Sequence, residues 1–383
     1  MAGRYPMDQR DKKLLLDISL QAGIFVALIL AAEIFLRVAA GEPRGFFNFL
    51  LPADKGLYPS NAVIYNNWGK VPYVVRTNSL GFRGPEMTLK KSGGVRRIVA
   101  IGDSMTDGFF VDNEGTYPHF LKEYLDEKYP AKYDVVNAAR AGGSIDKELA
   151  ILKYKALPLE PDIVLLMFCT NDISDLKGKN KDGLLARGVK SNKPGDHPDN
   201  ELFLALATKT AIGETLFKNL FWSGYARRNT DLDKKMGVSR YEVEGAKSYL
   251  ANAVSYNTRF KNTDGMVLEN VFSKEAEGLT GNYLYVLGEF NEVCARNSSK
   301  LYFVYMPAYS QIYDKKTSMR IRDILNDACK KMSISFIDLT ETMRREGQDK
   351  VLFLAPLDYH LNPEGNKVIA RGICEYLVKD KIS

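Results

Sequence analysis

Two short segments, far apart in the chain, carry the residue types that nucleophilic catalysis needs. Residues 102–108, Gly-Asp-Ser-Met-Thr-Asp-Gly, follow an apolar run, so Ser104 should lie where a strand ends and a helix begins. A serine hydroxyl becomes a good nucleophile only when a neighbouring base accepts its proton. His360 can be that base, and Asp358 can hold the required tautomer and stabilise the imidazolium that forms. The other two of the three histidines lie in poorer contexts, at a helix start and in a polar loop.

Two further loops offer hydrogen-bond donors for a negatively charged reaction intermediate. Gly142 and Gly143 follow a strand-like run, and paired glycines allow the backbone to approach a ligand closely. Asn171 follows another apolar run, where its side-chain amide could donate to an oxyanion. Each feature also has a structural interpretation, as a strand-to-helix turn for the glycines and as a helix cap for the asparagine.

Apolar runs alternate with amphipathic stretches over the region that contains these loops. This alternation predicts an α/β fold, a doubly wound, flavodoxin-like parallel sheet with helices on both faces. In such sheets ligands bind beyond the carboxyl ends of the strands, where these loops would meet. The five predicted strands are Arg97–Ile101, Tyr133–Asn137, Ile163–Phe168, Leu301–Met306 and Ser333–Leu339. The predicted helices are one capped by Thr116 and then Lys147–Tyr154, Tyr283–Arg296, Thr317–Lys331 and Pro363–Leu377.

The alternation stops near Ile173 and resumes near Leu279, and this interval is too long for a simple connection. We therefore predict an insertion after the third strand, at about residues 174–278. Its first part, 177–193, is basic, and a later part, 203–222, carries apolar residues at amphipathic spacing. The segment could be a solvated loop and a lid with an ordinary core. It could also hold an anionic polymer, a lipid surface or a partner.

An apolar stretch, residues 14–40, follows several basic residues near the start of the chain. Glu33 interrupts it, and its uncharged part falls short of the usual span of about 20 residues. Glu33 and Arg37 are four residues apart, so they can pair on one helix face near the membrane interface. We interpret residues 14–40 as a single-pass anchor, with residues 1–13 cytoplasmic and the body exported. A cleaved signal peptide and an amphipathic surface helix are the alternatives.

The composition, 45% hydrophobic and 26% charged with four cysteines, is that of an ordinary globular protein and rules out a disordered, collagen-like or cysteine-stapled chain. A polytopic membrane protein is also ruled out, because only one segment is long and apolar enough to span. A formal net charge of +6 without a concentrated basic stripe gives no reason to expect a nucleic-acid partner. No spacing of the four cysteines resembles a metal site or a redox pair, so we expect buried free thiols rather than disulfides. The sequence leaves the oligomeric state open.

In chain order, the four motifs resemble those of the SGNH (GDSL-type) hydrolases. The resemblance implies that Ser104 is the nucleophile and that Asp358 and His360 complete a catalytic triad. It implies an oxyanion hole made of the Ser104 and Gly142 backbone N–H groups and the Asn171 amide. It implies no metal and no organic cofactor.

The resemblance covers roughly residues 77–172 and 283–377. Residues 77–84, Thr-Asn-Ser-Leu-Gly-Phe-Arg-Gly, also look like the lead-in of membrane-anchored bacterial members, and we interpret Arg83 as a surface charge. One departure is Cys169, where the third motif normally begins with glycine. Its thiol should narrow the site without removing a donor.

The leading hypothesis is a serine esterase or deacylase held in the bacterial cytoplasmic membrane, with its catalytic domain on the periplasmic or extracellular side. The domain would span residues 95–383, after a membrane-proximal lead-in at 41–94. The substrate would be an acyl ester, with an O-acetylated polysaccharide or a lipid as candidates. One alternative is an O-acyltransferase that modifies an envelope polysaccharide through the same acyl-enzyme. Another is a non-catalytic glycan-binding or assembly protein on the same scaffold.

Overall fold

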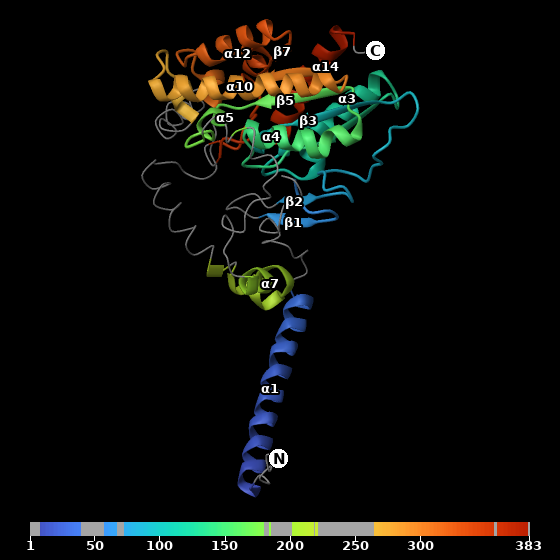
Figure 1. Cartoon of the computed structure of the whole chain (residues 1–383), viewed down its shortest axis with the longest axis vertical. Coiled ribbons are helices and arrows are strands. Elements are labelled where there is room, and N and C mark those ends of the chain that lie inside the picture. Colours follow the sequence, from blue (N-terminus) through green and yellow to red (C-terminus); the bar gives the residue numbers. More distant parts are fainter. Residues whose placement is uncertain are drawn as a thin grey trace, which may run out of the picture.

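A parallel β-sheet lies at the centre of the region that carries the catalytic motifs, in the computed structural model of the chain (Figure 1). The structure describes residues 8–39, 57–66, 73–179, 184, 201–217, 219–220, 264–355 and 358–381. Most of the basic segment predicted at 177–193 therefore lies outside the described residues.

The central sheet has five parallel strands in the order β4-β3-β5-β6-β7. Numbered along the chain, this order is two-one-three-four-five, so the winding reverses between β3 and β5. The prediction of a doubly wound, flavodoxin-like, five-stranded parallel sheet is confirmed. The strands are β3 (Arg96–Ile101), β4 (Tyr133–Asn137), β5 (Ile163–Phe168), β6 (Lys300–Tyr305) and β7 (Ser335–Asp338).

Helices cover both faces of this sheet, and they divide the apolar interior into two cores. The first core contains side chains of α4 (Ile145–Ile151), α10 (Lys274–Arg296) and α12 (Arg320–Lys331). The second contains side chains of α3 (Tyr117–Lys128) and α14 (Pro363–Lys379). Every residue of β5 is buried, because alternate side chains enter opposite cores, which explains its unbroken apolar run.

Shorter helical segments connect these elements. They are α2 (Ser104–Asp107), η2 (Asn113–Gly115), η3 (Leu152–Ala156), η4 (Leu157–Leu159), α5 (Asn171–Ser174), η7 (Asp264–Val267), α11 (Tyr309–Tyr313) and α13 (Thr340–Glu346).

Helix α14 brings the C-terminal part of the chain back to the first strand. The Tyr117 N–H at the start of α3 donates to Asn366 Oδ1 of α14, 3.0 Å away and 249 residues later. Asn362 caps α14, because its Oδ1 accepts from the Gly365 N–H at 2.8 Å. The residues just before Asn362 are therefore held at a fixed position beside α3.

The largest difference from the sequence prediction is the start of α10. The helix was expected from Tyr283 but begins at Lys274, because the Ser273 side chain caps it by accepting from the Ala276 N–H at 3.2 Å. Gly278 and Gly281 lie within these added turns. Glycine has low helix propensity, so the local sequence weakens the helical signal that packing against the core restores.

The lead-in contributes a small antiparallel hairpin, β1 (Val63–Asn66) and β2 (Tyr73–Arg76), on the motif side of the large sheet. Its buried side chains form a third apolar cluster with Phe110. Arg83 is buried, with 4% of its surface exposed, so our interpretation of it as a surface charge is wrong. Its burial is tolerated because its guanidinium donates to backbone carbonyls at the end of α2 and in the residues that follow.

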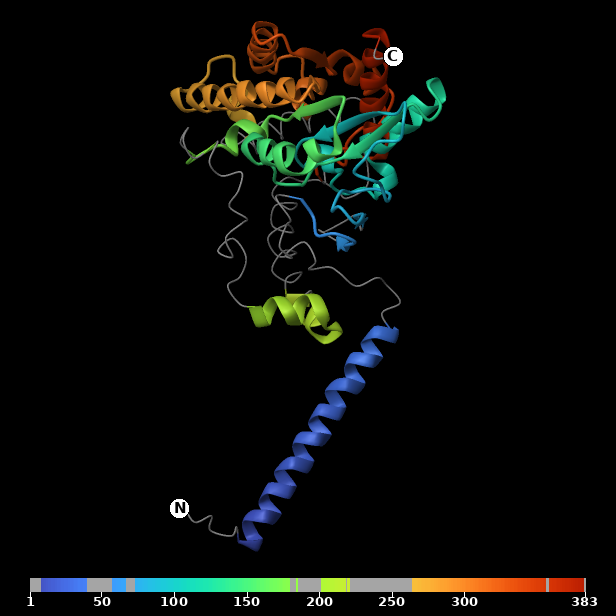
Figure 2. The same cartoon turned by 45° about the vertical axis from the view of Figure 1, so that its right-hand side comes forward.

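One described helix, α1 (Gln9–Ala39), is long and apolar enough to cross a membrane, and it lies near the N-terminus, where a signal sequence would also lie. Helix α7 (Glu201–Lys209) and the helical residues 211–217 lie across its C-terminal end (Figure 2). All four cysteines are buried free thiols, as predicted.

The structure separates two glycine-to-alanine substitutions by their effect on stability. Gly365→Ala would place a methyl carbon 2.1 Å from the Leu352 carbonyl oxygen, so we expect a loss of about 1–3 kcal/mol or more in the free energy of unfolding. Gly281→Ala, on the exposed side of α10, meets no described atom within 4 Å and should add about 0.5–1 kcal/mol. Chemical denaturation of both variants would measure the difference, and equal effects would contradict the packing around Gly365.

Candidate active site

The loops singled out from the sequence meet at the carboxyl edge of the sheet, around the first turn of α2. Gly102 directly follows β3 and leaves no room for a side chain, because a Cβ there would lie 2.3 Å from Thr106 Oγ1. Asp103 then caps α2, since its Oδ1 accepts from the Met105 N–H at 3.0 Å. Ser104 is consequently the first residue of the helix, with its side chain only partly buried.

The segment before α14 brings a base to this serine. The Leu354 N–H donates to the His360 carbonyl at 3.0 Å, and an antiparallel bridge between Phe353 and Leu361 closes the loop. His360 Nε2 lies 2.8 Å from Ser104 Oγ, although the two residues are 256 positions apart. His360 Nδ1 lies 2.5 Å from Asp358 Oδ1, which also accepts from the His360 N–H at 3.0 Å. The structure therefore brings Ser104, His360 and Asp358 into one hydrogen-bonded chain.

The surroundings of His360 set its protonation. Burial disfavours the imidazolium, but the hydrogen bond and charge of Asp358 outweigh burial and raise the pKa of His360 above its usual 6.5. The rings of Phe109 and Phe110 lie against the imidazole, with centroids 5.0 and 5.7 Å from it. These aromatic neighbours, which sequence reasoning missed, restrict the directions in which the imidazole can turn.

Gly142 lies in the loop after β4 with a backbone φ of +76°, a left-handed conformation that favours glycine. Space around it is open, because a Cβ there would meet no atom of the described residues within 4 Å. The adjoining Gly143 lies close to the turn between β3 and α2, since a Cβ added to it would lie 3.5 Å from the Gly102 carbonyl oxygen. The loop thus runs beside the start of α2, with backbone exposed where a ligand could approach.

Asn171, the first residue of α5, reaches the same place but is already engaged. Its Nδ2 donates to Asp103 Oδ2 at 2.9 Å and to Asp175 Oδ2 at 3.3 Å. Asp103 Oδ2 in turn lies 3.4 Å from Ser104 Oγ. The amide is therefore beside the serine, with both of its protons directed at carboxylates in this structure.

Two acidic side chains, Glu148 and Asp172, are buried behind these loops. Burial and the nearby charge of Asp103 raise the pKa of Glu148 well above its usual value, and burial and the charge of Glu148 do the same for Asp172. In the described part of the chain, neither carboxyl oxygen of Glu148 has a hydrogen-bond partner. The Glu148 Oε1 atom lies 3.5 Å from the Cβ position of Gly143. Glu148 therefore lies against the glycine loop in surroundings that favour the protonated form of its carboxyl group.

A buried network that sequence reasoning missed connects the lead-in to the far end of α2. The Arg83 guanidinium donates to the carbonyls of Asp107 at 2.5 Å, Gly108 at 3.0 Å and Val111 at 2.5 Å. Asp107 Oδ2 accepts from the Tyr58 hydroxyl at 2.5 Å. The only sequence signal for this network is the motif run 77–84, whose contacts cannot be derived from spacing.

The same carboxylate of Asp107 reaches the second motif loop. Its Oδ2 accepts from the Ala141 N–H at 3.0 Å, directly before Gly142. Asn137, at the end of β4, donates to the Thr106 and Asp107 carbonyls at 3.0 and 3.3 Å. Helix α2 and the loop that contains Gly142 are therefore held to each other by direct hydrogen bonds.

Cys169, which we expected to narrow the site, is buried and 3% exposed in the second core. Burial and the charge of Asp103 raise its pKa well above the usual value, so it remains a thiol. A thiol held in this way is a poor nucleophile, because the thiolate is the reactive form.

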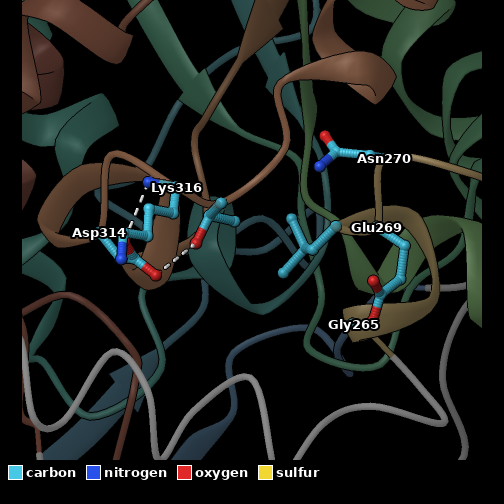
Figure 3. Close-up of a pocket in the computed structure, with 7 residues that line it drawn as sticks. Gly265, Glu269, Asn270, Asp314 and Lys316 are labelled. Atoms are coloured by element: carbon cyan, nitrogen blue, oxygen red, sulfur yellow. Dashed lines mark hydrogen bonds between the residues drawn. The ribbon is translucent and has the colours of Figure 1, made fainter.

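A polar pocket of the structure lies between the η7 turn and the loop after α11 (Figure 3). Asp314 organises one wall, accepting from the Lys316 N–H at 2.9 Å and from the Thr317 hydroxyl at 3.4 Å. The lining residues do not include the predicted catalytic side chains. Within the described ranges, no group of three or more His, Cys, Asp or Glu side chains is arranged to hold a metal.

Comparison with known proteins gives one family and several distant structures. No curated protein matches the chain. An α/β hydrolase from the metagenome of Lake Arreo, LAE5, is 14% identical, with a TM-score of 0.40 over 74% of this chain and 94% of its own. Axe2, an acetylxylan esterase from Geobacillus stearothermophilus, is 12% identical, with a TM-score of 0.40 over 78% of this chain and 98% of its own.

The family match covers the first three motif loops. Residues 100–193 match the model of the GDSL-like lipase/acylhydrolase family. This match confirms the resemblance that the ordered motifs indicated: residues 100–193 are similar to the GDSL-like lipase/acylhydrolase family, and the similarity supports an SGNH-type hydrolase that acts on ester bonds.

Proposed function

We propose that the protein is a serine esterase of the cell envelope that hydrolyses acyl esters, with O-acetyl esters as the first class to test. One observation carries this proposal: Ser104 Oγ, His360 Nε2 and His360 Nδ1 form a continuous chain to Asp358, with distances of 2.8 and 2.5 Å. This is the geometry that a serine needs in order to lose its proton as it attacks a carbonyl.

In the acylation step, Ser104 Oγ attacks the ester carbonyl carbon while its proton moves to His360 Nε2. Asp358 stabilises the imidazolium through the hydrogen bond to Nδ1. The imidazolium then gives its proton to the leaving alcohol as the carbon–oxygen ester bond breaks. In deacylation, a water molecule attacks the acyl-enzyme carbonyl and gives a proton to His360. His360 then returns the proton to Ser104 Oγ as the bond between the acyl carbon and Oγ breaks, which releases the acid and restores Ser104.

The negative charge of the tetrahedral intermediate needs donors, and we assign the Ser104 and Gly142 N–H groups and the Asn171 amide to it. The open space at Gly142 supports this assignment. To donate to the oxyanion, the Asn171 amide must give up one of its present hydrogen bonds. We assign this loss to the longer bond, the one to Asp175 at 3.3 Å. The 2.9 Å bond to Asp103 can then keep the amide in place.

We further propose that α1 anchors the enzyme, with residues 1–13 in the cytoplasm and a hydrolase domain at 95–383 on the exported side. The length and apolar character of α1 support a span, and the basic residues before its apolar stretch support this orientation. The lead-in at 41–94 would then connect the span to the enzyme.

Ser104→Ala should abolish hydrolysis of p-nitrophenyl acetate, lowering kcat by on the order of 10⁴–10⁶-fold because no nucleophile remains. The same variant should no longer react with a fluorophosphonate probe. The matched control is Ser92→Ala, an exposed serine in the loop before β3, which should leave both signals unchanged. Undiminished turnover by a folded Ser104→Ala variant would refute the proposed mechanism.

Asp358→Asn should lower kcat by on the order of 10⁴-fold, because the tautomer of His360 is no longer fixed. The pH profile gives a second readout. Neutral His360 is the active base, so wild-type kcat/KM should fall on the acid side through a pKa above 6.5. Losing the carboxylate removes the effect that raises this pKa, so the acid limb should move to lower pH. Asp327→Asn, on the exposed side of α12, is the control, and an unmoved acid limb in Asp358→Asn would contradict the pairing.

A further inference from the structure

The C-terminal end of α1 carries an ion pair that also binds part of the insertion. Glu33 and Arg37 pair at 2.7 Å, as their spacing predicted. The Glu33 carboxylate accepts from the Ala211 N–H at 2.8 Å and from the Ile212 N–H at 3.0 Å. These are backbone donors at the start of a helical segment, where a negative charge is favourable. A residue that interrupts the apolar run of α1 thus has a defined partner in the insertion.

Arg37, the other member of the ion pair, contacts the helix that precedes Ala211. Its Nη2 donates to the Lys209 carbonyl at 2.9 Å, at the C-terminal end of α7. A cation is favourable there, because the last carbonyls of a helix are unsatisfied and carry partial negative charge. The ion pair of α1 therefore forms hydrogen bonds to the end of one helix and to the start of the next.

The corner between the two helical segments is closely packed. Thr210 Oγ1 accepts from the Gly213 N–H at 3.0 Å and donates to the Leu206 carbonyl at 2.8 Å. Gly213 has no room for a side chain, since a Cβ there would lie 2.4 Å from the Leu206 carbonyl oxygen. The two segments, residues 201–209 and residues 211–217 with 219–220, therefore form one bent unit, which we call the interfacial pair.

The interfacial pair leaves large apolar side chains uncovered on both of its segments. Their exposed fractions are 66% for Leu202, 39% for Leu206, 54% for Leu216 and 60% for Leu220. Ala207 and Ala211, near the corner, are buried. A helix pair that exposes leucines while it buries alanines is suited to a partly apolar environment rather than to water alone.

The position of the pair along α1 indicates what covers these leucines. From Leu14 to Glu33 a helix rises about 28 Å, close to the thickness of a bilayer's hydrocarbon region, about 30 Å. If α1 spans a membrane, Glu33 and Arg37 lie at the boundary on the side of the enzyme. Figures 1 and 2 both show α7 crosswise at that end of α1, between it and the catalytic sheet.

We propose that the interfacial pair is a membrane-binding element that lies in the lipid headgroup region, with its exposed leucines in the acyl boundary. This inference rests on the proposed anchoring by α1. Glu33 and Arg37 fix the pair to the anchor, and the bilayer covers its apolar side. This part of the insertion therefore binds the membrane rather than the substrate.

The test uses the full-length protein in vesicles of phosphatidylcholine and phosphatidylglycerol. Nitroxide labels are placed at Leu206→Cys, at Leu216→Cys and, as a control on the enzyme body, at Val271→Cys, which is 79% exposed. Labels at 206 and 216 should be about 5–10 Å within the interface by oxygen and nickel accessibility, and the label at 271 should be in water. The unsubstituted chain, whose cysteines are buried, gives the labelling background.

The contact between Glu33 and the interfacial pair is tested by Glu33→Ala in the Leu216→Cys background. Asp17→Asn, on the same helix, is the control. Loss of Glu33 should increase the mobility of the label at 216, whereas Asp17→Asn should not change it. The inference about the interfacial pair would be wrong, and the anchoring would stand, if the protein resists extraction from the vesicles but the labels at 206 and 216 are as water-exposed as the label at 271. Protein that is extracted by alkaline carbonate would overturn the anchoring and the inference together. Turnover of p-nitrophenyl acetate, measured in parallel, reports the esterase proposal independently of both.

Discussion

The hydrogen bond between Ser104 and His360 joins two residues 256 positions apart, and much of the tertiary structure keeps that bond short. Strand β3 and the Asp103 cap fix the serine, while the Asn362 cap of α14 fixes the segment that carries the histidine. Helices α3 and α14 share one core on the same face of the sheet. A displacement of α14 would therefore move the segment that carries His360 relative to the Ser104 hydroxyl.

A second set of buried bonds holds the opposite side of the site. Arg83 and Asp107 tie the lead-in to the end of α2 and to the loop that contains Gly142. Their charges are buried at a place where the guanidinium and the carboxylate also satisfy backbone groups, which is the condition under which buried charges are tolerated. The described residues of the lead-in are thus packed as part of the hydrolase body, and not only as a connection to α1.

The sequence allowed the centre of the sheet to be predicted, because β3, β5 and β6 are buried on both faces and read as nearly continuous apolar runs. Ser104, Asp358 and His360 could be proposed because each lies in a short motif with its own chemistry. Arg83 was misjudged, because nothing local distinguishes a buried arginine from an exposed one. The hydrogen bonds from Asn171 to Asp103 and Asp175 could not be predicted from the sequence either, since they arise from the way α5 packs beside the turn that carries Ser104. The early start of α10 depends on a cap and on packing that outweigh two glycines.

The order of the catalytic parts along the chain has a consequence for biosynthesis. The proposed nucleophile, Ser104, is translated more than 250 residues before the proposed base and its carboxylate, at residues 358–360. Until those residues and α14 have been translated, Ser104 remains an ordinary alcohol beside an incomplete core. Under the proposed mechanism, a nascent chain that lacks residues 358–360 and α14 therefore has no activated serine, and ester cleavage begins only after α14 can hold His360 in place.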